Sequence, residues 1–174
     1  HKEYRRQRQM CIRDRLNRYN IPIILSPIIM PTTHGDKTPT ELRLSRDQLK
    51  IIMSKYATNL FGASCTAGIS RFRIRPDGVV NPCEMMRTID LGNVYNDSFK
   101  KVMDGDKRKK WVEEYKKILD KHECNSCRLR KRCNMCPGLF YVQNGDYNKK
   151  DDFLCMHAAI KEEIDIERKG GMEK

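Results

Sequence analysis

The sequence CNSCRLRKRCNMCPG, residues 124–138, constrains this chain more than any other feature. It contains two Cys-x2-Cys pairs, separated by five residues that are mostly basic. Two thiolates with this spacing can reach one metal centre from a single turn, and soft sulfur suits zinc and iron–sulfur clusters. The stretch therefore predicts a site for a metal ion or an iron–sulfur cluster.

The composition indicates that more than apolar burial stabilises the chain. Of its 174 residues, 39% are hydrophobic and 33% are charged, and eight are cysteines. We see no secretory signal and no membrane-spanning stretch, because the N-terminus is charged and the longest apolar patch, residues 21–31, is short and contains prolines. We therefore expect a cytoplasmic protein without membrane contact, whose reduced thiols bind metal.

Residues 1–15 are expected to be foreign to the protein. The codons for MCIRDR, residues 10–15, can match a transposon end used in preparing sequencing libraries, so we interpret the segment as a cloning or assembly scar. The alternative is a real basic N-terminal arm. Without the scar Cys11 is lost, and seven cysteines remain: Cys65, Cys83, Cys124, Cys127, Cys133, Cys136 and Cys155.

Residues 16–60 resemble one β/α unit. The β-branched run at 21–31 predicts a buried strand, and the lack of alternation suits a parallel sheet covered on both faces. A helix should begin after Ser45, because Ser45 and Gln48 fit a capping box. One strand and one helix do not make a domain, so we expect this unit to be the end of something larger.

Residues 61–166 have a different character. Alternation around the sequence PDG, residues 76–78, predicts a hairpin, and the apolar stripe over residues 106–123 predicts an amphipathic helix. A last helix is expected over residues 153–167, and residues 167–174 should fray. The fold class expected from these elements is α+β.

Three kinds of chemistry could use the seven thiols. A tetrahedral zinc site could take the four cysteines of the run, but it would leave Cys65, Cys83 and Cys155 unexplained. Disulfides suit neither an odd number of thiols nor a chain without signs of secretion. Iron–sulfur clusters would use every thiol, and the ending Cys136-Pro137 matches bacterial ferredoxin runs, whose last cysteine crosses to a second cluster.

The whole cysteine pattern resembles the SPASM domain, the C-terminal extension of radical SAM enzymes that mature peptides and proteins. The similarity runs from Cys65 to about Ala159 and includes RIRPDGVVNPCE, LGNV, CNSC, RCNMCPG and NGD. Residues 16–60 are similar to the end of a radical SAM partial barrel. The resemblance thus implies a small cysteine-rich domain, residues 61–166, preceded by a barrel remnant.

The family pattern implies two auxiliary 4Fe–4S clusters, the first held by Cys65, Cys83 and Cys136 and the second by Cys124, Cys127, Cys133 and Cys155. This chain departs from the pattern of many members, because two residues rather than three precede Cys136 in the run. Ser64, not cysteine, precedes Cys65. The first cluster would therefore have three protein ligands and an open iron position, which a substrate group or an exogenous ligand could occupy.

The Cys-x3-Cys-x2-Cys triad of radical SAM enzymes does not occur in this sequence. In the family that triad binds the cluster that cleaves S-adenosylmethionine. We therefore expect a fragment that is not active alone, with S-adenosylmethionine a cofactor of the full-length enzyme only. The resemblance implies two partners, a ribosomally made peptide or protein substrate and an electron donor.

Several other residues are weaker candidates. Glu84 follows Cys83, and in sulfatase-maturing relatives an acid at this place acts as a base, although a surface residue is the commoner explanation. His34 would lie at the end of the expected strand, where barrel sites gather. His122 and His157 lie near cysteines, but the seven thiols leave no need for them as ligands.

The basic run RLRKR, residues 128–132, has several possible roles. Its cations could offset the negative charge of a cluster, remain a solvated loop, or dock an acidic leader peptide. A rival function is a zinc-binding structural or nucleic-acid-binding module that uses the run to hold phosphates. Aromatic residues for base stacking are scarce, at 7% of the chain, so nucleic acid is the weaker partner.

Overall fold

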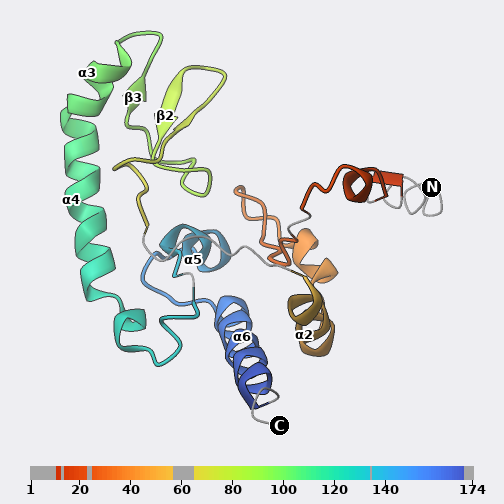
Figure 1. Ribbon diagram of the computed structural model, residues 1–174. Coiled ribbons are helices and arrows are strands. Elements are labelled where there is room, and N and C mark those ends of the chain that lie inside the picture. Colours follow the sequence, from red (N-terminus) through yellow and green to blue (C-terminus); the bar gives the residue numbers. More distant parts are fainter. Residues whose placement is uncertain (1–10, 13, 23–24, 57–64, 134, 171–174) are drawn as a thin grey trace.

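The elements fall into two groups in the part of the chain that the structure, a computed structural model, describes: residues 11–170 except 13, 23–24, 57–64 and 134. A three-stranded sheet lies beside the short helix α3 (Phe99–Asp104) and the long helix α4 (Asp106–Lys121). Helices α2 (Arg46–Lys55), α5 (Pro137–Asn144) and α6 (Asp152–Gly170) form the second group, in which α5 and α6 lie between α4 and α2 (Figure 1).

The sheet is antiparallel, in the order β1 (Arg73–Ile74), β2 (Val79–Asn81) and β3 (Gly92–Asn93). The predicted hairpin is confirmed, since β1 and β2 pair on either side of the turn at residues 76–78. Gly78 makes that turn with a φ of 81°, and a Cβ there would lie 2.4 Å from Oδ1 of Asn93.

The apolar stripe of α4 packs on the sheet, as its sequence predicts. The core at this face is made of buried side chains from β2, the loops around the sheet, α3 and α4, namely Ala67, Val80, Met86, Leu91, Val102, Trp111 and Tyr115. After Lys121 the chain turns into the short 3-10 helix η2 (Glu123–Ser126), which carries the first cysteine of the run. Helix α4 therefore links the sheet to the cysteine-rich end of the molecule.

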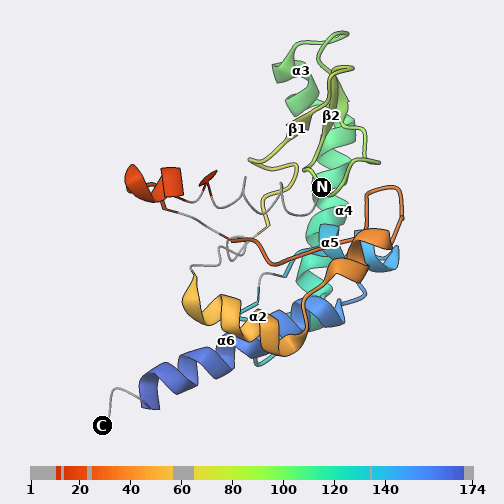
Figure 2. The same cartoon turned by 90° about the vertical axis from the view of Figure 1, so that its right-hand side faces the viewer.

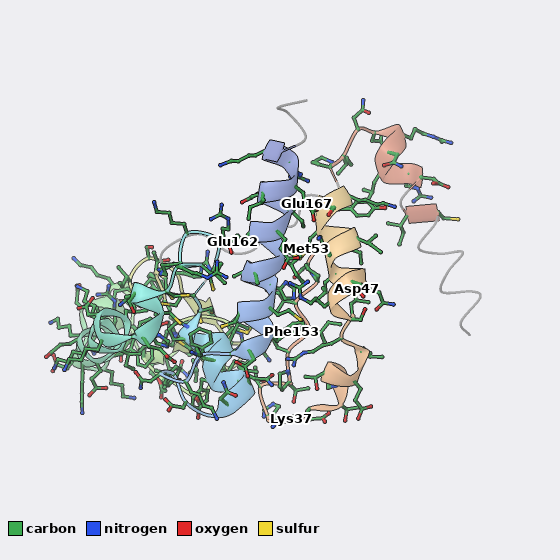
Figure 3. All side chains as sticks on the ribbon, turned by 90° about the horizontal axis from the view of Figure 1, so that it is seen from below. Lys37, Asp47, Met53, Phe153, Glu162 and Glu167 are labelled. Carbon is green, nitrogen blue, oxygen red and sulfur yellow. The ribbon has the colours of Figure 1, made fainter. Side chains whose placement is uncertain are left out.

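Helices α2 and α6 lie side by side (Figures 2 and 3). Leu49 and Met53 of α2 are buried against α6, chiefly on Ile160 and Ile164. The capping box predicted at the start of α2 is confirmed, because Ser45 and Gln48 exchange side-chain and backbone hydrogen bonds. This pairing attaches the first part of the chain to the last helix.

The strand predicted at 21–31 is not present in its described residues, 21–22 and 25–31. A strand needs a neighbour to pair its backbone groups, and no described strand lies beside this segment. Instead, Ile28 and Met30 pack on the helices, and Nε of Arg43 donates to the carbonyl oxygen of Ile29 over 2.8 Å. The short 3-10 helix η1 (Thr38–Leu42) precedes Arg43.

The C-terminal part of the chain continues helix α6, whereas most of residues 1–15 lie outside the described residues. Residues 167–170, expected to fray, complete helix α6, because Lys50 bonds Glu167 and Arg168 bonds the carbonyl oxygen of Ser54. Of the expected scar, residues 11, 12, 14 and 15 are described, and the rest lie outside the described residues. None of the described helices has the length and apolar character needed to cross a membrane.

Candidate metal centre

Three cysteines converge between the sheet and helix α5. Cys65 opens the loop before β1, Cys83 follows β2, and Cys136 is the residue directly before α5. Burial raises the pKa of Cys83, and a charged Cys65 raises it further, while the backbone amides of Met85 and Met86 oppose the shift. The two thiols therefore lie within electrostatic reach of each other.

Cys136 belongs to this first thiol group. The pKa of Cys136 is raised to about 12, chiefly by burial and also by the charges of Cys65 and Cys83, while the backbone amide of Leu139 opposes the shift. Helix α5 begins with Pro137, whose missing N–H costs nothing at a helix start, so the chain turns sharply at Cys136. The last cysteine of the run is thus directed to the thiols of the hairpin.

A cavity lies at the first thiol group. It has a volume of about 280 Å³, and its lining includes Cys65, Cys83, Cys136, Arg71, Met135 and Leu139. The guanidinium of Arg71 lowers the pKa of Cys83, against the stronger effect of burial. The three thiols therefore border a partly open space with mostly apolar walls.

The other four thiols form a second group at the start of α6. Cys124 is buried on η2, Cys127 is exposed at the end of η2, and Cys133 and Cys155 are half-buried. The pKa of Cys124 is raised to about 11, chiefly by burial and then by the charges of Cys133 and Cys155. Burial and then a charged Cys155 likewise raise the pKa of Cys133.

The donor chemistry of these groups fits iron–sulfur clusters. The seven cysteines of the two groups are free thiols, so one group offers three soft sulfur donors and the other offers four. Across the described residues, no three His, Cys, Asp or Glu side chains stand in the arrangement that holds a single metal ion.

A family comparison agrees with this geometry. The family described as SPASM, an iron–sulfur cluster-binding domain, matches residues 65–137. By this match, residues 65–137 are similar to a SPASM domain. No curated protein and no solved structure matches the chain. The SPASM match includes six of the seven thiols, and Cys155 lies beyond its end.

The basic run of the SPASM domain is tied to helix α6. Arg128 pairs with Glu162, and Nε of Arg132 donates to Oδ2 of Asp165 over 2.9 Å. These two cations are therefore paired with acids of α6. The charge of Arg130, by contrast, lowers the pKa of Cys133 against the effect of burial.

Sequence reasoning missed Lys161 as a cation near the second thiol group. Its charge lowers the pKa of Cys133, and burial lowers the pKa of Lys161 itself. Lys161 lies on α6, outside the basic run. Its position six residues after Cys155 gave no periodic signal that the two side chains serve one site.

Sequence reasoning also missed a contact of Tyr115, which it assigned only to the apolar face of α4. The hydroxyl of Tyr115 lies 3.3 Å from Sγ of Cys65, within hydrogen-bonding distance. Burial, followed by the hydrogen bond to Cys65, raises the pKa of Tyr115. The sequence did offer a signal, because Tyr115 lies on an apolar stripe. A tyrosine hydroxyl buried there requires a hydrogen-bond partner.

The weaker candidates are placed as follows. Glu84 borders the cavity, but its carboxylate pairs with Arg73 at 2.6 Å and also with Arg87, and its side chain is 51% exposed. His34 is exposed on the loop before η1. The structure thus places Glu84 in ion pairs at the edge of the cavity and His34 on an exposed loop, and the role expected for Glu84 stays a prediction.

The two histidines near cysteines are buried. Nδ1 of His122 accepts a hydrogen bond from the backbone N–H of Cys124 at 3.1 Å, so His122 orients the η2 backbone. His157 packs edge-on against Phe153, with ring centroids 4.6 Å apart, and burial lowers the pKa of His157 to about 4. His157 is therefore neutral at physiological pH.

Proposed function

We propose that the chain binds two 4Fe–4S clusters, the first through Cys65, Cys83 and Cys136 and the second through Cys124, Cys127, Cys133 and Cys155. The observation that carries the proposal is the position of Cys136. Although only two residues separate it from Cys133, the thiols that perturb its pKa are Cys65 and Cys83. A lone zinc site in the run would need Cys136 beside Cys133 and the first pair.

When bound, such clusters supply one-electron redox chemistry. The residues of this chain set the surroundings of each cluster. At the first group, three thiols border a cavity with mostly apolar walls, and with these three ligands one iron of a four-iron cluster would be open to a substrate group or an exogenous ligand. At the second group, Arg130 and Lys161 bring positive charge to Cys133, which favours a more negative cluster.

We propose further that the chain is part of a radical SAM enzyme that modifies a peptide or protein. SPASM domains generally occur in radical SAM enzymes, which supports this assignment. In that enzyme, S-adenosylmethionine would be cleaved by a core outside this sequence, and the clusters would transfer electrons or position the substrate. Reduced thiols and an external electron donor suit a cytoplasmic location.

Anaerobic reconstitution tests the proposal. The purified chain should take up about eight iron and eight sulfide ions and show broad absorbance near roughly 400 nm, as expected for two four-iron clusters. Cys83→Ala and Cys127→Ala should each lose about half of the iron, whereas Cys11→Ala should lose none. Binding of zinc alone, which gives no visible band because its d shell is full, would reject the proposal.

A further inference from the structure

We propose that Tyr115 is a positioning residue for the first cluster, in which its hydroxyl donates a hydrogen bond to the cluster-ligating Sγ of Cys65 and raises the reduction potential of that cluster. The inference rests on the proposed function, since it requires Cys65 to be a ligand. It adds a residue of helix α4 to a site otherwise built from cysteines.

The direction of the hydrogen bond follows from the chemistry of the pair. Oη of Tyr115 and Sγ of Cys65 lie 3.3 Å apart, and in the free thiol either atom can donate. A ligating thiolate has no hydrogen, whereas tyrosine, with an ordinary pKa near 10, keeps its proton at neutral pH. Among the described residues, Cys65 is the partner of this hydroxyl, so Tyr115 becomes the donor.

The ring of Tyr115 is held rigidly. Its side chain is 1% exposed, and it stacks on Trp111, one turn earlier on α4, with ring centroids 4.9 Å apart and 18° between the planes. Trp111 in turn lies against Gly68, where a Cβ would come within 2.7 Å of its ring. The hydroxyl therefore has little freedom to turn away from Cys65.

Helix α4 also fixes the loop that carries Cys65. Nε of Arg108 donates to the carbonyl oxygen of Gly68 over 2.9 Å, and its Nη2 donates to that of Ile69 over 3.3 Å. Arg108 and Tyr115 thus hold the loop at two points, seven residues apart on one face of α4. A change at Tyr115 that keeps the ring should leave this attachment intact.

The effect on the cluster is electrostatic. A hydrogen bond to a ligating sulfur stabilises negative charge on the cluster, and the reduced cluster carries more of it. The low dielectric of a buried site strengthens the interaction. Removing the donor should therefore disfavour the reduced form of the first cluster more than its oxidised form.

The test uses Tyr115→Phe in the reconstituted chain, with Tyr141→Phe as the matched control. Tyr141 stacks on Tyr147, with ring centroids 4.5 Å apart, so the control also removes a hydroxyl from an aromatic pair near the domain core. In Tyr115→Phe, iron content should stay at the wild-type value. At a fixed redox potential of the solution, the ratio of reduced to oxidised first cluster should fall roughly twofold to tenfold. That range corresponds to the free energy that one hydrogen bond contributes. The second cluster should not respond, and Tyr141→Phe should match wild type.

The outcomes separate this inference from the function on which it rests. Repeating the titration with Cys127→Ala, which should keep only the first cluster, assigns the shift. An unchanged ratio in Tyr115→Phe with full iron content overturns the role of Tyr115 but leaves cluster binding intact, whereas a wild-type chain without iron rejects the proposed function itself. If Tyr115→Phe loses iron, the hydrogen bond is tested in wild-type protein instead, by comparing the reduced first cluster in H2O and in D2O. The hydrogen bond requires an exchangeable proton coupled to that cluster. The absence of such a proton would reject the hydrogen bond.

Discussion

Nε of Arg132 donates a hydrogen bond to Oδ2 of Asp165 over 2.9 Å, and this ion pair joins the basic run to helix α6. Arg128 pairs with Glu162 on the same helix. Because α6 also carries Cys155, the two ion pairs hold the loop between Cys127 and Cys133 beside the fourth thiol of the second group. The positive charge of the run thus has a structural use that its sequence did not reveal.

Removing both acids in a Glu162→Gln, Asp165→Asn variant should weaken the second cluster site. Exposed ion pairs contribute little to folding, so we expect the free energy of unfolding to fall by about 1 kcal/mol or less in urea titrations. Iron loss to a chelator should be faster than in wild type at low salt, and the difference should shrink at about 1 M salt, where such pairs are screened. Glu113→Gln, which breaks an exposed pair with Lys117 on α4, is the control. Faster loss from the first cluster instead would contradict the argument.

Cys155 offers a sharper test, because it lies outside the matched SPASM residues. Its pKa is raised by burial and, among smaller causes, by the charge of Cys127. Cys155→Ala should lose the iron of the second cluster and keep that of the first, as measured by iron analysis and electron paramagnetic resonance. Cys155→Ser should behave in the same way if sulfur is required. Full iron content in both variants would exclude Cys155 as a ligand.

The buried thiols make the stability of the cluster-free chain depend on pH. The pKa values of Cys124 and Cys136, about 11 and about 12, lie above the value of about 8.5 for an unfolded thiol. Such groups stabilise the folded state below about pH 8.5, and this contribution is lost as pH rises through the folded values. The free energy of unfolding should therefore fall by up to ~1.4 kcal/mol per pH unit for each thiol.

Urea titrations of the cluster-free chain at pH 7, 8.5 and 10 measure this effect. Cys136→Ser removes one titrating group, so its stability should fall less steeply than that of wild type over the same range. Equal slopes for the two proteins would show that Cys136 is not buried as the structure has it.

Gly138→Ala should displace the first thiol group, although Gly138 is not itself part of that group. A Cβ at Gly138 would lie 2.9 Å from Cβ of Met85, so the start of α5 would have to move away from the loop after Cys83. We expect a loss of about 1–3 kcal/mol in the free energy of unfolding, as for other overpacked sites, and less iron in the first cluster. Gly170→Ala, which meets no atom within 4 Å, should be close to neutral in both measurements.

Local patterns predicted the local elements well. The turn at residues 76–78, the apolar stripe of α4 and the capping box of α2 each depend on residues within one or two turns of one another, which is the range that such patterns report. Helix α5 was missed, although its signals were present. Pro137 stands at its first position, and Gly145 ends it with a φ of 76°.

Long-range relationships could not be predicted in this way. The strand expected at 21–31 failed because strand formation depends on a pairing partner, which a local apolar run does not specify. The division of the seven thiols came from the ferredoxin-like ending of the run and from the family resemblance, and its ligand assignment stays a prediction. The hydrogen bond between Tyr115 and Cys65 joins residues fifty positions apart, and no spacing rule connects them.

The packing of α2 against α6 sets a practical limit on how the SPASM domain can be isolated. Leu49 and Met53 cover Ile160 and Ile164, which lie one to three turns beyond Cys155 on the same helix. A shortened chain that starts at Cys65 would expose the apolar side of α6, including Ile160 and Ile164, to solvent. Such a chain should aggregate. Preparations for spectroscopy should therefore retain the chain from Ile28 onward, because Ile28 and Met30 pack on the same helices.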